Sequence, residues 1–269
     1  MSSILERIYA AKRTEVARLR SAVALDTVAA RARLAPAARD FLASLKSHRP
    51  AIIAEIKRAS PSKGEILPGL DPVAVARAYQ GSGAAAISVL TDVHFKGSID
   101  DLRAVRAAVD LPLLRKDFVF DPYQVFEARA AGADCILLIG AMLSEDEIRS
   151  LSALAGKLGM AALIEVHQAK ELRLSAIAEA PLLGINNRDL HTFITDIAVT
   201  ESLLADYKGR ATIVSESGIE ESEDIRRVYQ AGAQAVLIGE SLLRGGAPAT
   251  KLGNLMRSLD RVPREQVSG

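Results

Sequence analysis

From residue 51 onward, short apolar runs alternate with longer segments that have a helical spacing of apolar residues. The runs cover residues 51–56, 84–90, 112–116, 133–138, 161–165, 182–186, 211–215 and 233–238. Short runs that are almost continuously apolar are typical of strands buried on both faces, as in a parallel sheet. The pattern therefore predicts about eight strands, each followed by a helix.

The boundaries between these elements carry turn and cap residues. Glycines that stop a helix just before a strand are expected at Gly83, Gly132 and Gly232. Asp71-Pro72 and Asp121-Pro122 pair an N-cap with a proline at the first helical position. Ser144 and Glu147 have the spacing of a capping box. The repeat of strand, helix and glycine thus continues through most of the chain.

Eight such units predict an α/β fold, a (β/α)8 TIM barrel with an N-terminal helical extension. We expect residues 1–269 to form one barrel domain, with residues 1–50 as the extension. The alternative is a doubly wound sheet, which would more often carry a glycine-rich turn after its first strand. Here the residues at that place are Lys57, Arg58, Ala59 and Ser60.

The extension is predicted to be helical because its apolar residues recur at helical spacing. These residues are Ile4, Leu5, Ile8, Val16 and Leu19. Its basic residues are interpreted as a solvated helix face: Lys12, Arg13, Arg18 and Arg20. A lid, a barrel plug and an oligomer contact all remain open as roles for this segment.

Polar residues follow the predicted strands at their C-terminal ends, where barrel enzymes place their active sites. They are Glu55, Lys57, Lys116, Glu165, Asn186, Arg188, Glu216, Ser217, Gly218, Gly239 and Glu240. Glu55 and Lys57 are two residues apart, so they point to the same side of their strand. A structural ion pair would explain these two alone, but a barrel would bring the whole set to one mouth.

The residue types at this mouth indicate acid–base chemistry. Lys57 and Lys116 could lower each other's pKa, and Glu55 would keep Lys57 charged and in place. Lys116 is then the better proton donor and Glu165 a candidate general base. A Schiff base on either lysine also remains possible.

The last two strand ends indicate phosphate binding instead. Ser217 and Gly218 follow the seventh strand, and Gly239 and Glu240 follow the eighth. Small residues, backbone N–H groups and helix N-termini at these ends are a common phosphate site in barrels. Ser60 on the first loop could add to this site.

Composition narrows the classes of function. A net charge of +1 and few aromatic residues give no reason to expect nucleic acid or membrane partners. Cys135 is the only cysteine and lies in an apolar run, which fits a reducing compartment, so a cytoplasmic protein is expected. The four histidines have no metal-ligand spacing, so no metal is expected.

Several blocks together resemble the indole-3-glycerol phosphate synthase family. The opening block at residues 53–64 contains Glu55, Lys57 and Ser60 and resembles the family signature closely. Further blocks at residues 114–118, 163–167, 184–190 and 215–219 occur in the family's order. Two departures are a block at residues 91–98 that is one aromatic shorter around Phe95, and Glu240 where some members have serine.

The resemblance implies ring closure of 1-(2-carboxyphenylamino)-1-deoxyribulose 5-phosphate to indole-3-glycerol phosphate, CO₂ and water. It implies no cofactor and a small phosphorylated substrate. A monomer is expected, although an oligomer contact by the extension stays open. By position, Lys116 would be the general acid, Glu165 its acid–base partner, and Lys57, held by Glu55, a substrate ligand. The resemblance also implies substrate contacts by Ser60, Phe118, Leu137, Asn186, Arg188, Leu190, Glu216, Ser217, Gly218, Gly239 and Glu240.

Two other functions stay open. One is another phosphate-binding barrel enzyme of the sugar-phosphate isomerase type. The other is a barrel that binds a phosphorylated metabolite without turnover. The lysine pair disfavours the first, and the set of Glu55, Lys57, Lys116 and Glu165 disfavours the second.

Overall fold

The computed structural model describes residues 4–60, 64–174, 177, 179–189, 192–205 and 207–260. Within these residues, eight parallel strands close into a barrel in the order β1-β10-β9-β8-β7-β6-β5-β4. The strands are β1 (Ala51–Ile56), β4 (Ala86–Leu90), β5 (Leu113–Lys116), β6 (Cys135–Ile139), β7 (Ala161–Val166), β8 (Leu182–Asn186), β9 (Thr212–Glu216) and β10 (Ala235–Ile238). The predicted (β/α)8 barrel is confirmed, and a doubly wound sheet is excluded because the sheet has no open edge.

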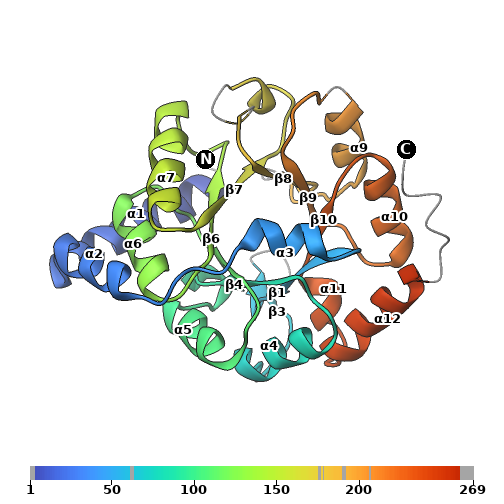
Figure 1. Cartoon of the computed structure of the whole chain (residues 1–269), viewed down its shortest axis with the longest axis horizontal. Helices are drawn as coiled ribbons and strands as arrows, with labels where there is room; N and C mark the ends of the chain where they lie inside the picture. Colours follow the sequence, from blue (N-terminus) through green and yellow to red (C-terminus); the bar gives the residue numbers. More distant parts are fainter. Residues whose placement is uncertain are drawn as a thin grey trace.

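Helices surround the barrel in a ring (Figure 1). They are α4 (Pro72–Gly81), α5 (Ile99–Ala108), α6 (Pro122–Ala130), α7 (Glu145–Lys157), α9 (Ala198–Ala205), α10 (Ser222–Gln230), α11 (Glu240–Leu243) and α12 (Pro248–Asp260). Short 3-10 turns are η1 (Val93–Phe95) and η2 (Glu171–Arg173), and a small hairpin joins β2 (Ala59–Ser60) to β3 (Gly64–Glu65). The predicted caps at Asp71, Asp121 and Ser144 all accept hydrogen bonds from backbone N–H groups.

Successive side chains of each strand point to opposite sides of the barrel wall, and this divides the core into two layers. Ile52 and Ala54 of β1 belong to the larger layer between strands and helices. Ala51 and Ile53 belong to the layer inside the barrel. Because side chains alternate, Glu55 continues the inner row above Ile53. The same alternation places Lys116, Glu165 and Glu216 above inner-layer residues Leu114, Leu163 and Val214.

The N-terminal extension forms α1 (Ile4–Ala22), α2 (Leu25–Leu34) and α3 (Phe41–Ser47). Phe41 and Leu45 of α3 pack into the inner layer with Ala51 and Ala85, which lie at the N-terminal ends of strands. The helix α3 crosses the barrel on the face seen in Figure 1. It therefore plugs the end of the barrel opposite the predicted active site.

Helix α1 lies at the other end of the barrel, and one prediction about it is wrong. Lys12 is not on a solvated face, since its side chain is only 1% exposed. Its ammonium group lies 2.8 Å from Asp92 and 3.0 Å from Asp117. These aspartates follow β4 and β5, so the lysine joins α1 to two loops at the mouth. A helical period cannot distinguish a charged residue facing water from one facing two buried carboxylates.

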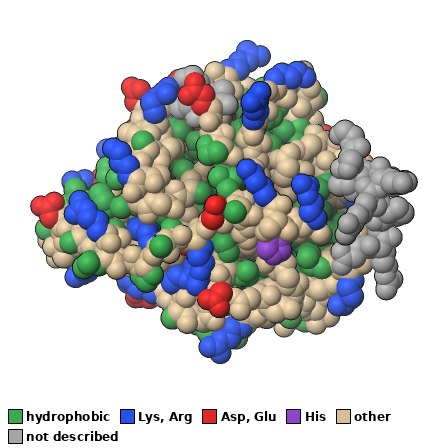
Figure 2. Space-filling model, viewed as in Figure 1, with side chains coloured by type: hydrophobic (Ala, Val, Ile, Leu, Met, Phe, Trp, Pro, Cys, Tyr) green, Lys and Arg blue, Asp and Glu red, His purple; other side chains and the backbone are tan. Residues whose placement is uncertain are grey.

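The surface on the α3 side carries charges of both signs. Lys and Arg side chains are spread over this face with Asp and Glu among them, rather than forming one continuous basic patch (Figure 2).

No helix within the described ranges has the length and apolar character needed to cross a membrane.

Candidate active site

A cavity of about 290 Å³ opens at the C-terminal ends of the strands. Fourteen of the fifteen residues predicted for the site line it: Glu55, Lys57, Ser60, Lys116, Phe118, Leu137, Glu165, Asn186, Arg188, Glu216, Ser217, Gly218, Gly239 and Glu240. The fifteenth, Leu190, lies outside the described residues. The barrel thus brings together residues that are up to 185 positions apart (Glu55 to Glu240).

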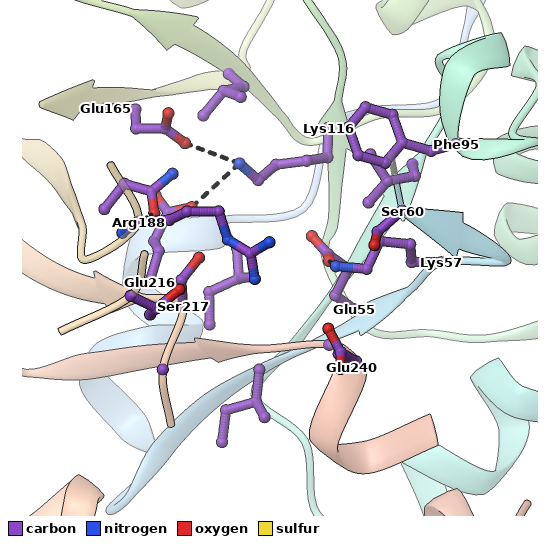
Figure 3. A pocket seen from close by; sticks show the side chains of 18 of the residues that line it. Glu55, Lys57, Ser60, Phe95, Lys116, Glu165, Arg188, Glu216, Ser217 and Glu240 are labelled. Carbon is purple, nitrogen blue, oxygen red and sulfur yellow. Dashed lines mark hydrogen bonds and ion pairs between the residues drawn. The ribbon is translucent and has the colours of Figure 1, made fainter. Parts of the chain in front are cut away.

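The centre of the cavity is a lysine held between two carboxylates (Figure 3). The Nζ atom of Lys116 lies 2.8 Å from Oε2 of Glu165 and 3.1 Å from Oε2 of Glu216. Both carboxylates are almost fully buried, and the lysine side chain is 13% exposed. Lys116 is the last residue of β5, Glu165 is the last but one of β7, and Glu216 is the last of β9.

The charge balance of this group differs from the prediction. Burial alone would lower the pKa of Lys116, but the charges of Glu165, Glu216 and Glu55 raise that pKa above its usual value. The expected lowering of the Lys116 pKa by Lys57 is therefore wrong. The sequence showed two lysines and several carboxylates but not their distances, and here the nearest groups are the carboxylates.

The two carboxylates beside Lys116 have pKa values displaced in opposite directions. Burial raises the pKa of Glu216 to about 7, with Glu165 and Glu55 adding to it and Lys116 opposing it. Burial would also raise the pKa of Glu165, but Lys116 and His167 hold that pKa below its usual value. Near neutral pH, Glu165 is therefore ionised while Glu216 exchanges a proton.

Glu55 and Lys57 form a second ion pair across the cavity from this group (Figure 3). Lys57 Nζ lies 3.1 Å from Glu55 Oε1, as the sequence predicted. Glu55 is 5% exposed. A Cβ atom at Gly239 would lie 2.5 Å from Glu55 Oε1, so a glycine at this position leaves room for the carboxylate.

The turn after β9 has an unusual backbone. Ser217 and Gly218 have φ values of +67° and +79°, and such values are uncommon for a serine. The side-chain amide of Asn187 donates to the carbonyl of Ser217 at 3.0 Å and holds this turn. A strained non-glycine residue held by its surroundings is a feature found at ligand sites, and successive N–H groups in such turns can bind anions.

Glu240 follows β10, and its carboxylate forms an ion pair with Arg244. The two groups lie 2.8 Å apart, and Arg244 also lies 3.4 Å from Glu220. Because a cation offsets both carboxylates, their repulsion of a bound phosphate is reduced.

Apolar and aromatic residues form one wall of the cavity. Phe118 and Phe95 stack with ring centroids 6.5 Å apart. Leu137 of β6 lies at the floor of the cavity, where it belongs to the inner core layer. Although the block at residues 91–98 is short, Phe95 does line the cavity.

Sequence analysis missed several residues at this site. Ile8 from α1, and Phe193 and Thr195 from the loop after β8, also line the cavity. The apolar spacing of the extension contained Ile8 but gave no sign of what it faces. His167 follows β7 in an irregular segment and contacts Glu165, a contact that the absence of metal-ligand spacing among the histidines did not indicate.

Among the residues with described positions, no group of three or more His, Cys, Asp or Glu side chains has a geometry that could hold a metal ion. The polar groups of the cavity are instead arranged as ion pairs of lysine with glutamate. Such pairs suit proton transfer and the binding of an anionic substrate.

Solved structures with a similar fold are distant in sequence. A 3-hexulose-6-phosphate synthase from Salmonella typhimurium matches with a TM-score of 0.61 and 14% identity, over 78% of this chain and 99% of that one. A thiamine phosphate pyrophosphorylase from Pyrococcus furiosus matches with a TM-score of 0.60 and 15% identity, over 86% of this chain and 100% of that one. At this identity the matches show the barrel fold alone.

Closer relatives share sequence along nearly the whole chain. The indole-3-glycerol phosphate synthase of Roseiflexus sp. (strain RS-1) is 48% identical over 265 residues, covering 95% of this chain and 98% of the relative. That of Laribacter hongkongensis (strain HLHK9) is 47% identical over 262 residues, covering 95% and 99%. A family model described as indole-3-glycerol phosphate synthase matches residues 5–255. The chain therefore belongs to the indole-3-glycerol phosphate synthase family.

Proposed function

We propose that the chain closes the pyrrole ring of 1-(2-carboxyphenylamino)-1-deoxyribulose 5-phosphate, giving indole-3-glycerol phosphate, CO₂ and water. Family membership supports this reaction. The structural observation that carries it is Lys116, held between Glu165 and Glu216 at the centre of the cavity. A proton donor flanked by two carboxylates of different pKa suits a reaction with several proton transfers.

Lys116 is the general acid, which protonates the substrate ketone as the ring closes. Before the reaction its proton is held tightly by two carboxylates. Because the pKa of Glu216 is about 7, this residue can take up a proton near neutral pH. Protonation of Glu216 removes one of the charges that hold the lysine proton, and it thereby makes Lys116 a better donor.

Glu165 is the base that removes a proton in the later steps. While Lys116 is charged, the low pKa of Glu165 makes it a weak base. Once Lys116 has given up its proton, that cation is gone and the basicity of Glu165 increases. The 2.8 Å contact between Lys116 and Glu165 thus couples the two steps, because loss of the Lys116 proton increases the basicity of Glu165.

The remaining residues hold the substrate. Lys57, fixed by Glu55, binds the substrate carboxylate or hydroxyl groups and assists dehydration. Asn186 and Arg188 position the anthranilate end, and Phe118 and Leu137 enclose its ring. Backbone N–H groups hold the phosphate at the turns that follow β9 and β10, and Ser60 adds to this site. The phosphate contacts involve Ser217, Gly218, Gly239 and Glu240.

A cytoplasmic monomer stays a prediction. It is based on the composition and on the family resemblance, and light scattering of the purified protein would check the oligomeric state.

The test is incubation of the purified protein with this substrate in the presence of a chelator and without added cofactor. Indole absorbance would follow ring closure, trapped CO₂ would follow decarboxylation, and mass spectrometry would identify the product. Formation of both products supports the proposal. A rearranged phosphosugar without CO₂ would instead favour the isomerase function, and tight binding in calorimetry without product would favour a binding protein.

A further inference from the structure

The two carboxylate oxygens of Glu165 face two different basic groups. Oε2 lies 2.8 Å from Nζ of Lys116, and Oε1 lies 3.3 Å from Nε2 of His167. The imidazole lies outside the set of residues that line the cavity, and its side chain is 8% exposed. It contacts Glu165 from within the protein, so a bound substrate would leave the contact in place.

Glu171 fixes His167 from its other side. Its Oε2 atom accepts the backbone N–H of His167 at 2.8 Å and lies 3.9 Å from Nδ1 of the ring. Glu171 is itself 6% exposed. The imidazole therefore lies between two buried carboxylates, and this environment favours its protonated form.

We propose that His167 is a positioning residue for Glu165: its imidazolium holds one carboxylate oxygen, so that Glu165 stays ionised and correctly oriented after Lys116 has lost its proton. The inference rests on the proposed function, in which Glu165 is the base. It assigns no contact between His167 and the substrate.

The physical reason is the burial of Glu165. A buried carboxylate without a cation takes up a proton, because burial penalises the charged form. When Lys116 becomes neutral, the cation that opposed this effect from the cavity side is lost, and burial then favours the protonated form of Glu165. The cation that remains in contact with Glu165 is then His167. His167 thereby keeps Glu165 unprotonated until the step in which Glu165 acts as the base.

The protonation state of His167 agrees with this role. Burial lowers its pKa, but Glu165 and Glu171 outweigh burial and raise the pKa to about 9. The groups that face the imidazole are Glu165 of β7 and Glu171 of η2. Those that face Glu165 from other strands are Lys116 of β5 and Glu216 of β9. Glu55 of β1 acts on Lys116 and Glu216.

His167→Gln tests the proposal, since glutamine is polar and can donate a hydrogen bond but carries no charge to pair with Glu165. We expect the acidic limb of the kcat profile to move up by about one pH unit or more, so that kcat at a given pH on that limb falls about tenfold. The loss should shrink at pH 8, and KM should change less than about twofold. His48→Gln, at the plugged end of the barrel, is the matched control. An unchanged profile in His167→Gln would overturn the proposal.

A second measurement works without turnover. Titration of the imidazole by NMR, with the His167→Gln spectrum assigning the signal, should show a cation at pH 7 that loses its proton near pH 9. The Glu165 carboxyl carbon should titrate at higher pH in His167→Gln than in the parent protein. A neutral His167 at pH 7, or an unchanged titration of Glu165, would contradict the inference. Failure of the proposed function would show separately, as absence of product with the parent protein.

Discussion

The ammonium group of Lys12 lies 3.0 Å from Oδ1 of Asp117, the residue that directly follows Lys116. Asp117 also accepts the hydroxyl of Thr91 at 2.6 Å and is paired with Arg115 at 3.0 Å. A helix outside the barrel is therefore connected to the strand end that carries the proposed acid. On the same helix, Ile8 lies one turn before Lys12 and lines the cavity.

Lys12→Met should destabilise the protein by about 3 kcal/mol, because it removes a buried cation that contacts both Asp92 and Asp117. The charges of Asp117 and Asp92 raise the pKa of Lys12 even though burial opposes this, so the lysine is charged at neutral pH. Urea unfolding at pH 7 would measure the loss. Arg18→Met, at an exposed position of the same helix, should cost less than about 0.5 kcal/mol. Equal stability of both variants would show that the buried pairs contribute nothing.

Lys116→Ala should lower turnover by at least about a hundredfold, the scale of a lost general acid. The fold should persist, because Glu165 and Glu216 can share one proton once the lysine is absent. Turnover and thermal unfolding of the same preparation would measure both effects. Lys157→Ala, on the exposed surface of α7, is the control and should keep normal turnover. Near-normal turnover of Lys116→Ala would mean that another group is the acid.

Glu216 should make the protein less stable as the pH rises from about 5 to 7. Its folded-state pKa of about 7 lies above the usual value of 4.5, so the folded state binds the extra proton in this range. Stability that depends on this proton is complete below the unfolded pKa, and it is lost as pH rises through the folded one. A pKa that differs by one between the folded and unfolded states corresponds to about 1.4 kcal/mol of stability.

Urea unfolding at pH 5, 6, 7 and 8 would measure this dependence. Glu216→Gln should remove about 2 kcal/mol of the decline, since glutamine does not titrate. The Glu165 carboxylate has a lowered pKa, so its own effect lies below this pH range. The stability that His167 contributes through its raised pKa is also lost as the pH rises, but in both proteins. Parallel curves for the two proteins would refute a raised pKa at Glu216.

Gly239→Ala should lower kcat/KM by about tenfold, because a misplaced group in a site can cost that much or more. The added methyl group would lie 2.5 Å from Glu55 Oε1 and would push this carboxylate away from Lys57. Steady-state kinetics would measure the change. Gly156→Ala is the control, since nothing lies within 4 Å of its Cβ position in α7. Wild-type kinetics in Gly239→Ala would show that the Glu55–Lys57 contact does not matter for turnover.

Much of the fold could be predicted because its signals are local. The runs that form β1 and β6 are apolar for nearly their whole length, and only a sheet covered on both faces needs such strands. Asp71 and Asp121 mark helix starts by their own side chains. The site could be predicted for the same reason. In a barrel the C-terminal ends of all strands meet, so the position of Lys116 along its own strand already places it at the mouth.

The predictions that were wrong concern properties that depend on distances between elements. Lys12 and Arg18 share one helix and both are basic, yet one is buried against two aspartates and the other is exposed. The pKa of Lys116 was predicted to fall, since the sequence contains a second lysine, but Glu165 and Glu216 are nearer and raise it. Coulomb energies depend on separation and burial, and neither can be obtained from residue order.

The sequence by itself determined the barrel, the end at which the cavity lies and fourteen of the residues that line it, because these follow from alternation along strands and from local caps. Only the tertiary structure decided how those residues are paired: Lys116 between two glutamates, Lys57 with Glu55, and His167 behind Glu165. The reason is that pairing is set by the closure of the barrel and the packing of loops and α1 onto it. These contacts join residues from different strands and helices.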